Sequence, residues 1–133
     1  MKRFFTFILA LLMLALSGCS ATRTDITREE IVSAYQEAGY SVWTEVYDEK
    51  LEHGQIACVQ ADHPDGDYIY FRFFETEAEA KAYKQENYHP GTMGLFSAIF
   101  GDPSWPRWEV HGNILVEYDK PEFYKIFEKL LKE

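Results

Sequence analysis

The 133-residue sequence has few basic residues: 13 lysines and arginines stand against 22 acidic residues, so its formal charge is −9. A nucleic-acid-binding protein needs a basic face that displaces counterions from phosphates, so this deficit argues against a nucleic-acid partner. Prolines and glycines are also few, and no segment is of low complexity. With 47% hydrophobic residues, the chain is too apolar for a disordered acidic protein. Its length fits one domain.

The common catalytic and cofactor motifs are missing. The sequence contains no H-E-x-x-H, no G-x-S-x-G, no P-loop and no G-x-G-x-x-G. Its four histidines are scattered, each beside a turn signal. The carboxylates between Asp62 and Asp67 lack the spacing of a calcium loop, which favours a solvated hairpin tip. We therefore predict no cofactor and no metal, and an enzyme is the less favoured class.

Long hydrophobic runs are limited to one, from Phe4 to Leu16, interrupted only by Thr6. A transmembrane helix needs about 20 apolar residues, so this run is too short to span a bilayer comfortably. It follows the positive residues Lys2 and Arg3. A short basic start and a short apolar run are typical of a secretory signal peptide.

The run leads directly into Leu16-Ser17-Gly18-Cys19. An aliphatic residue, two small residues and a cysteine in this order resemble the lipobox of bacterial prolipoproteins. The resemblance implies cleavage between Gly18 and Cys19, lipidation of Cys19, and an extracytoplasmic protein anchored to a bacterial membrane by its N-terminal lipid. Two acyl chains would make the anchor stable, since each buried methylene contributes about 0.8 kcal/mol. The alternative is an ordinary cleaved signal with an incidental cysteine.

Cysteine is scarce, with only two residues in the chain. If Cys19 carries lipid, Cys58 is left without a disulfide partner, and its apolar neighbours predict a buried, inert thiol. Cleavage would remove Lys2 and Arg3 but no acidic residue, so the charge of −9 would become −11. We divide the chain into a signal peptide (1–18), a lipidated tether (19–26) and a single α+β domain (27–133).

Capping boxes mark two helix starts, at Thr27–Glu30 and at Thr76–Glu79. The first helix should stop at Gly39, the second should run to about Asn87, and a third should follow Pro121. Alternating residues predict five strands, at 42–47, 55–61, 67–74, 108–110 and 114–118. The order α-β-β-β-α-β-β-α, with hairpin connections, predicts a small antiparallel sheet whose helices pack mainly on one face.

The two faces of the predicted strands differ in composition. One set is plainly apolar and should bury against the helices: Val42, Val46, Ala57, Val59, Ile69, Phe71, Phe73, Ile114 and Val116. The opposite set is aromatic and polar, like an interface hot spot. From it and the preceding segment come the candidate binding residues: Trp43, Tyr68, Tyr70, Arg72, Trp105 and Arg107. The competing interpretation is that tyrosine and tryptophan are simply good strand residues.

Residues 88–104 form an unusually long connection that contains several large apolar side chains. A short helix over 92–100 that lies on the sheet would bury them; a movable flap is the alternative. We predict a binding or interaction module whose partner is an envelope protein or a small ligand. The alternatives are a small envelope enzyme or accessory subunit with 88–104 as its lid, and a purely structural role in a larger complex.

Overall fold

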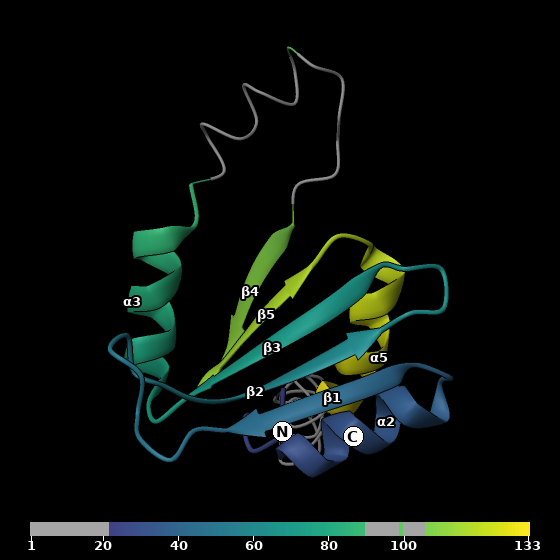
Figure 1. The fold of residues 1–133 in the computed structure, drawn as a ribbon, viewed down its shortest axis with the longest axis horizontal. Helices are drawn as coiled ribbons and strands as arrows, with labels where there is room; N and C mark the ends of the chain where they lie inside the picture. Colours follow the sequence, from purple (N-terminus) through teal and green to yellow (C-terminus); the bar gives the residue numbers. More distant parts are fainter. Residues whose placement is uncertain (1–21, 90–98, 100–105) are drawn as a thin grey trace, which may run out of the picture.

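The computed structural model describes residues 22–89, 99 and 106–133. Its elements, in chain order, are α2 (Arg28–Glu37), β1 (Ser41–Val46), β2 (Gln55–Asp62), β3 (Tyr68–Phe74), α3 (Glu77–Asn87), β4 (Arg107–His111), β5 (Ile114–Tyr118) and α5 (Pro121–Lys132). The strands form one antiparallel sheet in the order β1-β2-β3-β5-β4 (Figure 1). The predicted α+β order is confirmed. The signal peptide, the lipobox and the predicted helix 92–100, except Ile99, lie outside the described residues. None of the described helices is long and apolar enough to cross a membrane.

Both predicted capping boxes are present. The backbone N–H of Glu30 donates to the Thr27 hydroxyl at 3.2 Å, and the Thr27 N–H donates to the Glu30 carboxylate at 2.8 Å. The second box repeats this pattern between Thr76 and Glu79. Each box gives a hydrogen-bond acceptor to two backbone N–H groups that would otherwise be unpaired at the start of the helix. Local side-chain chemistry therefore fixes where α2 and α3 begin.

The main core lies between the sheet and the pair α2 and α5. It contains the apolar residues of β2, β3 and β5 together with helix residues such as Ile31, Tyr35 and Phe127. The Tyr35 hydroxyl donates to the carbonyl of Phe123 at 2.6 Å, which ties α2 to α5 inside this core. Most of the predicted apolar set is buried here, as expected.

Helix α3 packs on the opposite face of the sheet. Ala80 of α3 packs with Phe74 and Leu115, and Tyr83 and Trp108 flank this second cluster. Because the sheet twists, α3 and α5 flank the β4–β5 pair from opposite sides (Figure 1). Two helices on one face and one on the other agree with the predicted arrangement. The described helices cover the second face only towards β4 and leave its β1 end open.

The β4–β5 hairpin has a shorter turn than its sequence suggested. We expected three loop residues from His111 to Asn113, whereas His111 pairs with Ile114 and only Gly112 and Asn113 form the turn. Gly112 has φ +55°, which suits the first central position of a two-residue hairpin turn. A register change of one residue reverses the faces of a strand. The expected face of Arg107 is therefore wrong.

Val46 is a second correction. It was expected to bury against the helices, but 58% of its surface is exposed. β1 is an edge strand, and α2 lies beside its first part while its second part extends past the helix (Figure 1). Only Val42 among the β1 residues is half-buried. Strand alternation correctly predicted the face to which the Val46 side chain points. It could not show that α2 does not extend as far as this residue.

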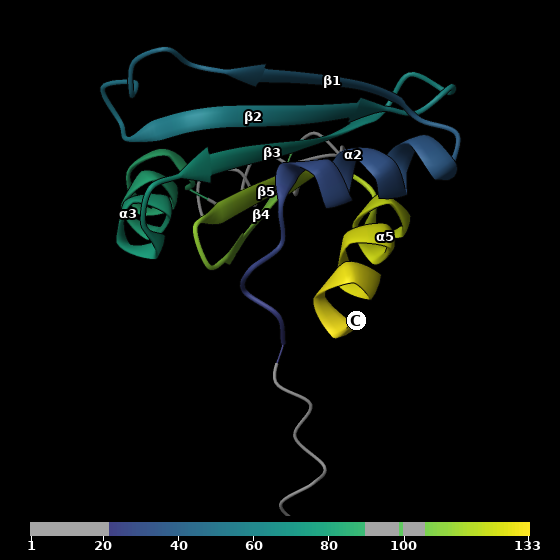
Figure 2. The same cartoon turned by 90° about the horizontal axis from the view of Figure 1, so that it is seen from below.

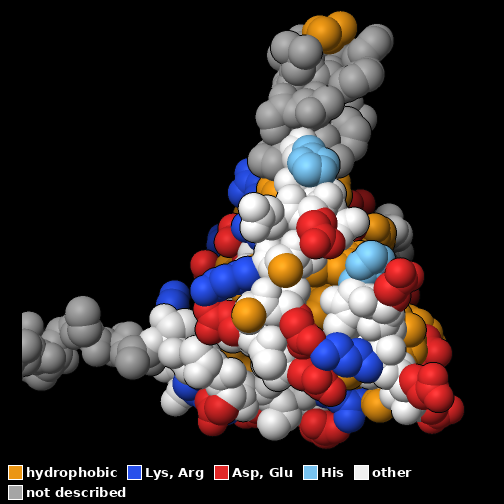
Figure 3. Space-filling view, turned by 90° about the vertical axis from the view of Figure 1, so that its left-hand side faces the viewer, with side chains coloured by type: hydrophobic (Ala, Val, Ile, Leu, Met, Phe, Trp, Pro, Cys, Tyr) orange, Lys and Arg blue, Asp and Glu red, His pale blue; other side chains and the backbone are white. Residues whose placement is uncertain are grey.

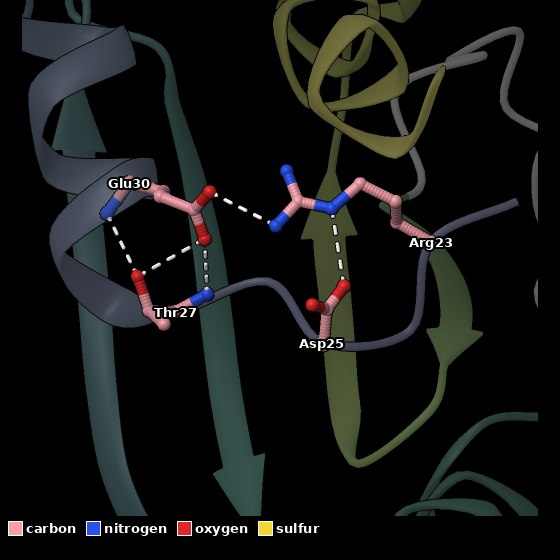
Figure 4. Close-up of polar contacts among 4 residues, drawn as sticks. All are labelled: Arg23, Asp25, Thr27 and Glu30. Carbon is pink, nitrogen blue, oxygen red and sulfur yellow. Dashed lines mark hydrogen bonds and ion pairs between the residues drawn. The ribbon is translucent and has the colours of Figure 1, made fainter. Parts of the chain in front are cut away.

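Part of the expected tether belongs to the folded domain (Figure 4). The Arg23 N–H donates to the Leu131 carbonyl at 2.9 Å, and its guanidinium pairs with Asp25 at 3.1 Å and Glu30 at 3.0 Å. Ile26 is buried in the main core. The Thr27 N–H, and then the Arg23 guanidinium, lower the pKa of Glu30. The polar composition of residues 20–25 suggested a tether because these pairings are not visible in sequence.

Candidate binding surface

A row of side chains crosses the second face of the sheet from one edge to the other. Trp43 of β1 faces Gln60 of β2, Gln60 faces Tyr70 of β3, Tyr70 faces Glu117 of β5, and Glu117 faces Trp108 of β4. Cross-strand neighbours on one face have their Cβ atoms about 5 Å apart, so these side chains form a continuous strip. The strip is aromatic at both ends and at its centre.

The β1 half of this strip is accessible. Trp43 is 50% exposed, and Gln60 and Tyr70 are half-buried; Tyr68, two residues before Tyr70 on the same face of β3, is 38% exposed. In Figure 2 no described helix lies above β1 and β2, whereas α2 and α5 lie below them. We call Trp43, Gln60, Tyr68 and Tyr70 the open face. It offers one indole ring, two phenol rings with their hydroxyls, and an amide.

The β4 half of the strip is packed. Trp108 stacks on Tyr83 with ring centroids 5.9 Å apart and on Tyr88 at 5.5 Å. The Trp108 Nε1 atom is buried and has no hydrogen-bond partner among the described residues. We call Phe74, Trp108 and Leu115, which lie under α3, together with Tyr83 of α3 itself, the covered half. Its aromatic side chains serve as core.

Arg72 joins the two halves and is held in place. Its guanidinium donates to Glu117 at 2.6 Å, and the two side chains are only 18% and 12% exposed. The guanidinium carbon also lies 4.5 Å from the Tyr70 ring centroid and 5.3 Å from that of Trp108. A cation enclosed in this way gains both an ion pair and cation–π contacts. Arg72 therefore orients the rings around it and presents little charge to a ligand.

A group of hydrogen-bonded side chains adjoins the open face. The Tyr47 hydroxyl donates to the buried Cys58 thiol at 3.5 Å, and the Gln55 amide donates to the Tyr47 hydroxyl at 3.4 Å. Burial raises the pKa of both Tyr47 and Tyr70, with hydrogen bonding to Cys58 as the next cause. Both phenols stay neutral near pH 7, so they act as hydrogen-bonding groups. The predicted burial of Cys58 is confirmed.

Four of the six predicted binding residues lie together on this face: Trp43, Tyr68, Tyr70 and Arg72. Arg107 faces Tyr118, whose ring belongs to the main core, so it lies on the other face of the sheet. Trp105 lies outside the described residues. Sequence reasoning missed Gln60, because it searched for aromatic and charged residues. It also missed that Trp108 lies on this face. A two-residue turn at Gly112-Asn113 would have placed Trp108 opposite Glu117.

The side of the molecule around α3 has a different character. A hollow of about 550 Å³ is lined by Lys81, Lys84, Gln85, Tyr88, Glu109 and Val110. Acidic and basic side chains are interspersed over this side (Figure 3). Among residues 22–89, 99 and 106–133, no group of three or more histidine, cysteine, aspartate and glutamate side chains has a metal-binding arrangement. The open face remains the most accessible aromatic surface of the described sheet.

No protein-family model, no curated protein and no solved structure matches this chain.

Proposed function

We propose that this protein is an extracytoplasmic lipoprotein, anchored to a bacterial membrane through Cys19, that binds an envelope partner with its open face. Support for the anchor comes from the order of a basic start, an apolar run and Leu16-Ser17-Gly18-Cys19. Support for the binding role comes from one observation above all. A half-exposed tryptophan and an exposed tyrosine lie on the same sheet face, at the end that no described helix covers.

The geometry of the N-terminal segment agrees with this role. Residues 22–26 leave the domain on the side of α2 and α5, away from the open face (Figure 2). Because Arg23 and Ile26 are fixed to the domain, the free chain after cleavage would run only from Cys19 to Thr22. At about 3.5 Å per residue it would reach roughly 14 Å. The domain would sit close to the membrane with its open face directed away from the bilayer.

The residues of the open face are suited to recognising a protein or a flat ligand. Tryptophan and tyrosine combine a large apolar area with a polar atom, and they dominate interface hot spots. Gln60 adds both a donor and an acceptor between them. The surface has no group that could act as a nucleophile at neutral pH, since the Tyr70 phenol is neutral. Binding is therefore the chemistry that these residues support best.

Lipidation is tested by growing cells with radiolabelled palmitate and by measuring the intact mass of the protein in the membrane fraction. We expect label and diacylglyceryl mass on the wild type, and neither on Cys19→Ser. The matched control is Cys58→Ser, which should keep both. An unmodified Cys19 in the wild type would refute the anchor.

Partner binding is tested by a photocrosslinking amino acid at Gln60, in cells, with the same group at Gln36 of α2 as the control. We expect one discrete crosslinked product from position 60 and none from position 36. Trp43→Ala should remove that product without lowering the protein level. Equal crosslinking from both positions, or none from position 60, would refute the binding role of the open face.

A further inference from the structure

Among the described residues, no strand pairs with the outer side of the β1 backbone. The Tyr47 N–H donates to the Ile56 carbonyl at 3.0 Å, continuing the register in which Val46 faces Ala57. Successive residues in an antiparallel ladder direct their N–H and C=O groups alternately to either side. Glu45 and Trp43 therefore bond to β2. The backbone groups of Val42, Thr44 and Val46 point away from the sheet.

In the part of the chain that the structure describes, this edge lacks the usual protection. Natural edge strands carry lysines, prolines, bulges or a covering element that prevent another strand from pairing. β1 contains no lysine and no proline, pairs in regular register over its whole length, and is flanked by α2 only at its start. At its other end Thr44 and Val46 are both exposed. On the other edge strand, β4, Trp108 and Val110 pack under α3.

The surroundings of the edge are acidic. Neither β1 nor β2 contains a lysine or arginine, while Glu45 and Asp62 lie on them and Asp48 and Glu49 follow β1 directly. The nearest cation along the chain, Lys50, is already paired with Glu75 and Glu79. An incoming strand with positive side chains would meet complementary charge. A second copy of this chain would bring the same acidic strand and a large negative charge.

We propose that the β1 edge, from Thr44 to Val46, binds an extended, lysine- or arginine-bearing segment of a partner protein as a sixth strand. Main-chain hydrogen bonds to Thr44 and Val46 would supply affinity. Contacts with the half-exposed Trp43 ring on one face and Val46 on the other, and pairing with Glu45, would supply specificity. Because Trp43 belongs to the open face, this proposal names the kind of partner that the open face binds, and it rests on the proposed function.

The test uses a synthetic nine-residue peptide that alternates lysine with valine and threonine and is capped at both ends. A peptide with glutamate in place of lysine is its control. Binding to the full mature protein in nonionic micelles is measured by fluorescence anisotropy, and backbone protection by hydrogen–deuterium exchange. We expect the lysine peptide to bind at least tenfold more tightly than the glutamate peptide and to slow amide hydrogen exchange at Thr44 and Val46. Equal affinity of the two peptides, or unchanged exchange there, would overturn the proposal.

Two variants at one exposed position separate backbone pairing from charge. Val46→Pro removes an outward N–H and should lower the affinity for the lysine peptide at least tenfold. Val46→Thr keeps that N–H, and its affinity should stay within twofold of the wild type. Val46→Lys keeps the N–H but adds a positive charge. It should therefore weaken binding of the lysine peptide and strengthen binding of the glutamate peptide, and this result does not depend on whether Val46→Pro folds. Full binding by Val46→Pro that retains the wild-type melting curve would contradict strand addition.

Two further readouts identify other outcomes. If light scattering shows a concentration-dependent dimer that Val46→Pro abolishes, the edge binds a second copy and the proposal is wrong. If the crosslink from position 60 survives in Val46→Pro, the open face binds a partner but the edge does not. If the lysine peptide binds the edge while position 60 gives no crosslink, the proposed role of the open face fails.

Discussion

The two halves of one sheet face have similar residues and different environments. Near β4, Trp108 stacks on Tyr83 of α3, and both form part of a core. Near β1, Trp43 and Tyr68 occupy the same face, and no described helix covers them. Aromatic composition therefore does not distinguish a packed surface from an accessible one. The position of one helix makes the difference.

The position of α3 follows from its connection to β3. The Thr76 capping box starts the helix two residues after β3 ends, and Ala80 lets the helix approach Phe74 and Leu115 closely. The helix therefore reaches β5 and β4 but not β1. Predictions about the two halves test whether this division is real.

The largest contrast should come from truncating one aromatic side chain in each half. Phe74→Ala empties a fully buried site and should lower the free energy of unfolding by about 3–5 kcal/mol. Trp43→Ala removes a half-exposed ring and should cost less than about 1 kcal/mol. Urea unfolding followed by far-UV circular dichroism measures both. Similar losses would mean that Trp43 is packed as tightly as Phe74.

A smaller effect is expected at the junction of the two halves. Glu117→Gln would leave the Arg72 guanidinium, which is largely buried, without its anionic partner. We expect a loss of about 1.5–3 kcal/mol, typical of a hydrogen bond to a charged group. Glu109→Gln, on the other face of β4, is the exposed control and should be nearly neutral. If the two variants unfold at the same urea concentration, the Arg72–Glu117 pair does not hold the halves together.

Weakening α3 at its first turn should cost about 1 kcal/mol. Thr76→Ala removes the capping hydroxyl, and Thr27→Ala does the same for α2. Only Thr76→Ala should increase hydrogen exchange in the covered half, because α2 packs on the other face. Increased exchange at Leu115 in both variants would show that the two clusters do not respond separately.

The smallest effect is predicted for Tyr68→Ser on the open face. Tyr68 is exposed, so the free energy of unfolding should change by no more than about 0.5 kcal/mol. The crosslinked product from position 60 should nevertheless decrease. A stable variant with undiminished crosslinking would exclude Tyr68 from the binding surface.

Much of the fold could be predicted from local patterns. The capping boxes at Thr27 and Thr76 and the turn at Gly66, where φ is +96°, depend on neighbouring residues only. Strand alternation correctly grouped Trp43 with Tyr70 and Arg72. These features need no knowledge of what lies beyond the segment itself.

The errors arose where distant contacts decide the outcome. The turn length at Gly112 sets the register of β4, and a change of one residue moved Arg107 to the other face and Trp108 onto the strip. The alanine- and glutamate-rich sequence of α3 has no strong apolar stripe to reveal which part of the sheet it covers. Arg23 could be assigned to the domain only from its contacts with Leu131 and Glu30.

The division of the sheet face is tested most directly by the accessibility of its two indole N–H groups. A soluble paramagnetic agent added to ¹⁵N-labelled protein broadens the NMR signals of exposed protons, and Trp43→Phe and Trp108→Phe assign the two signals. We predict strong broadening for Trp43, which is half-exposed, and little for Trp108, whose Nε1 is buried. Equal protection of both signals would contradict an open β1 half, and with it the proposed binding surface.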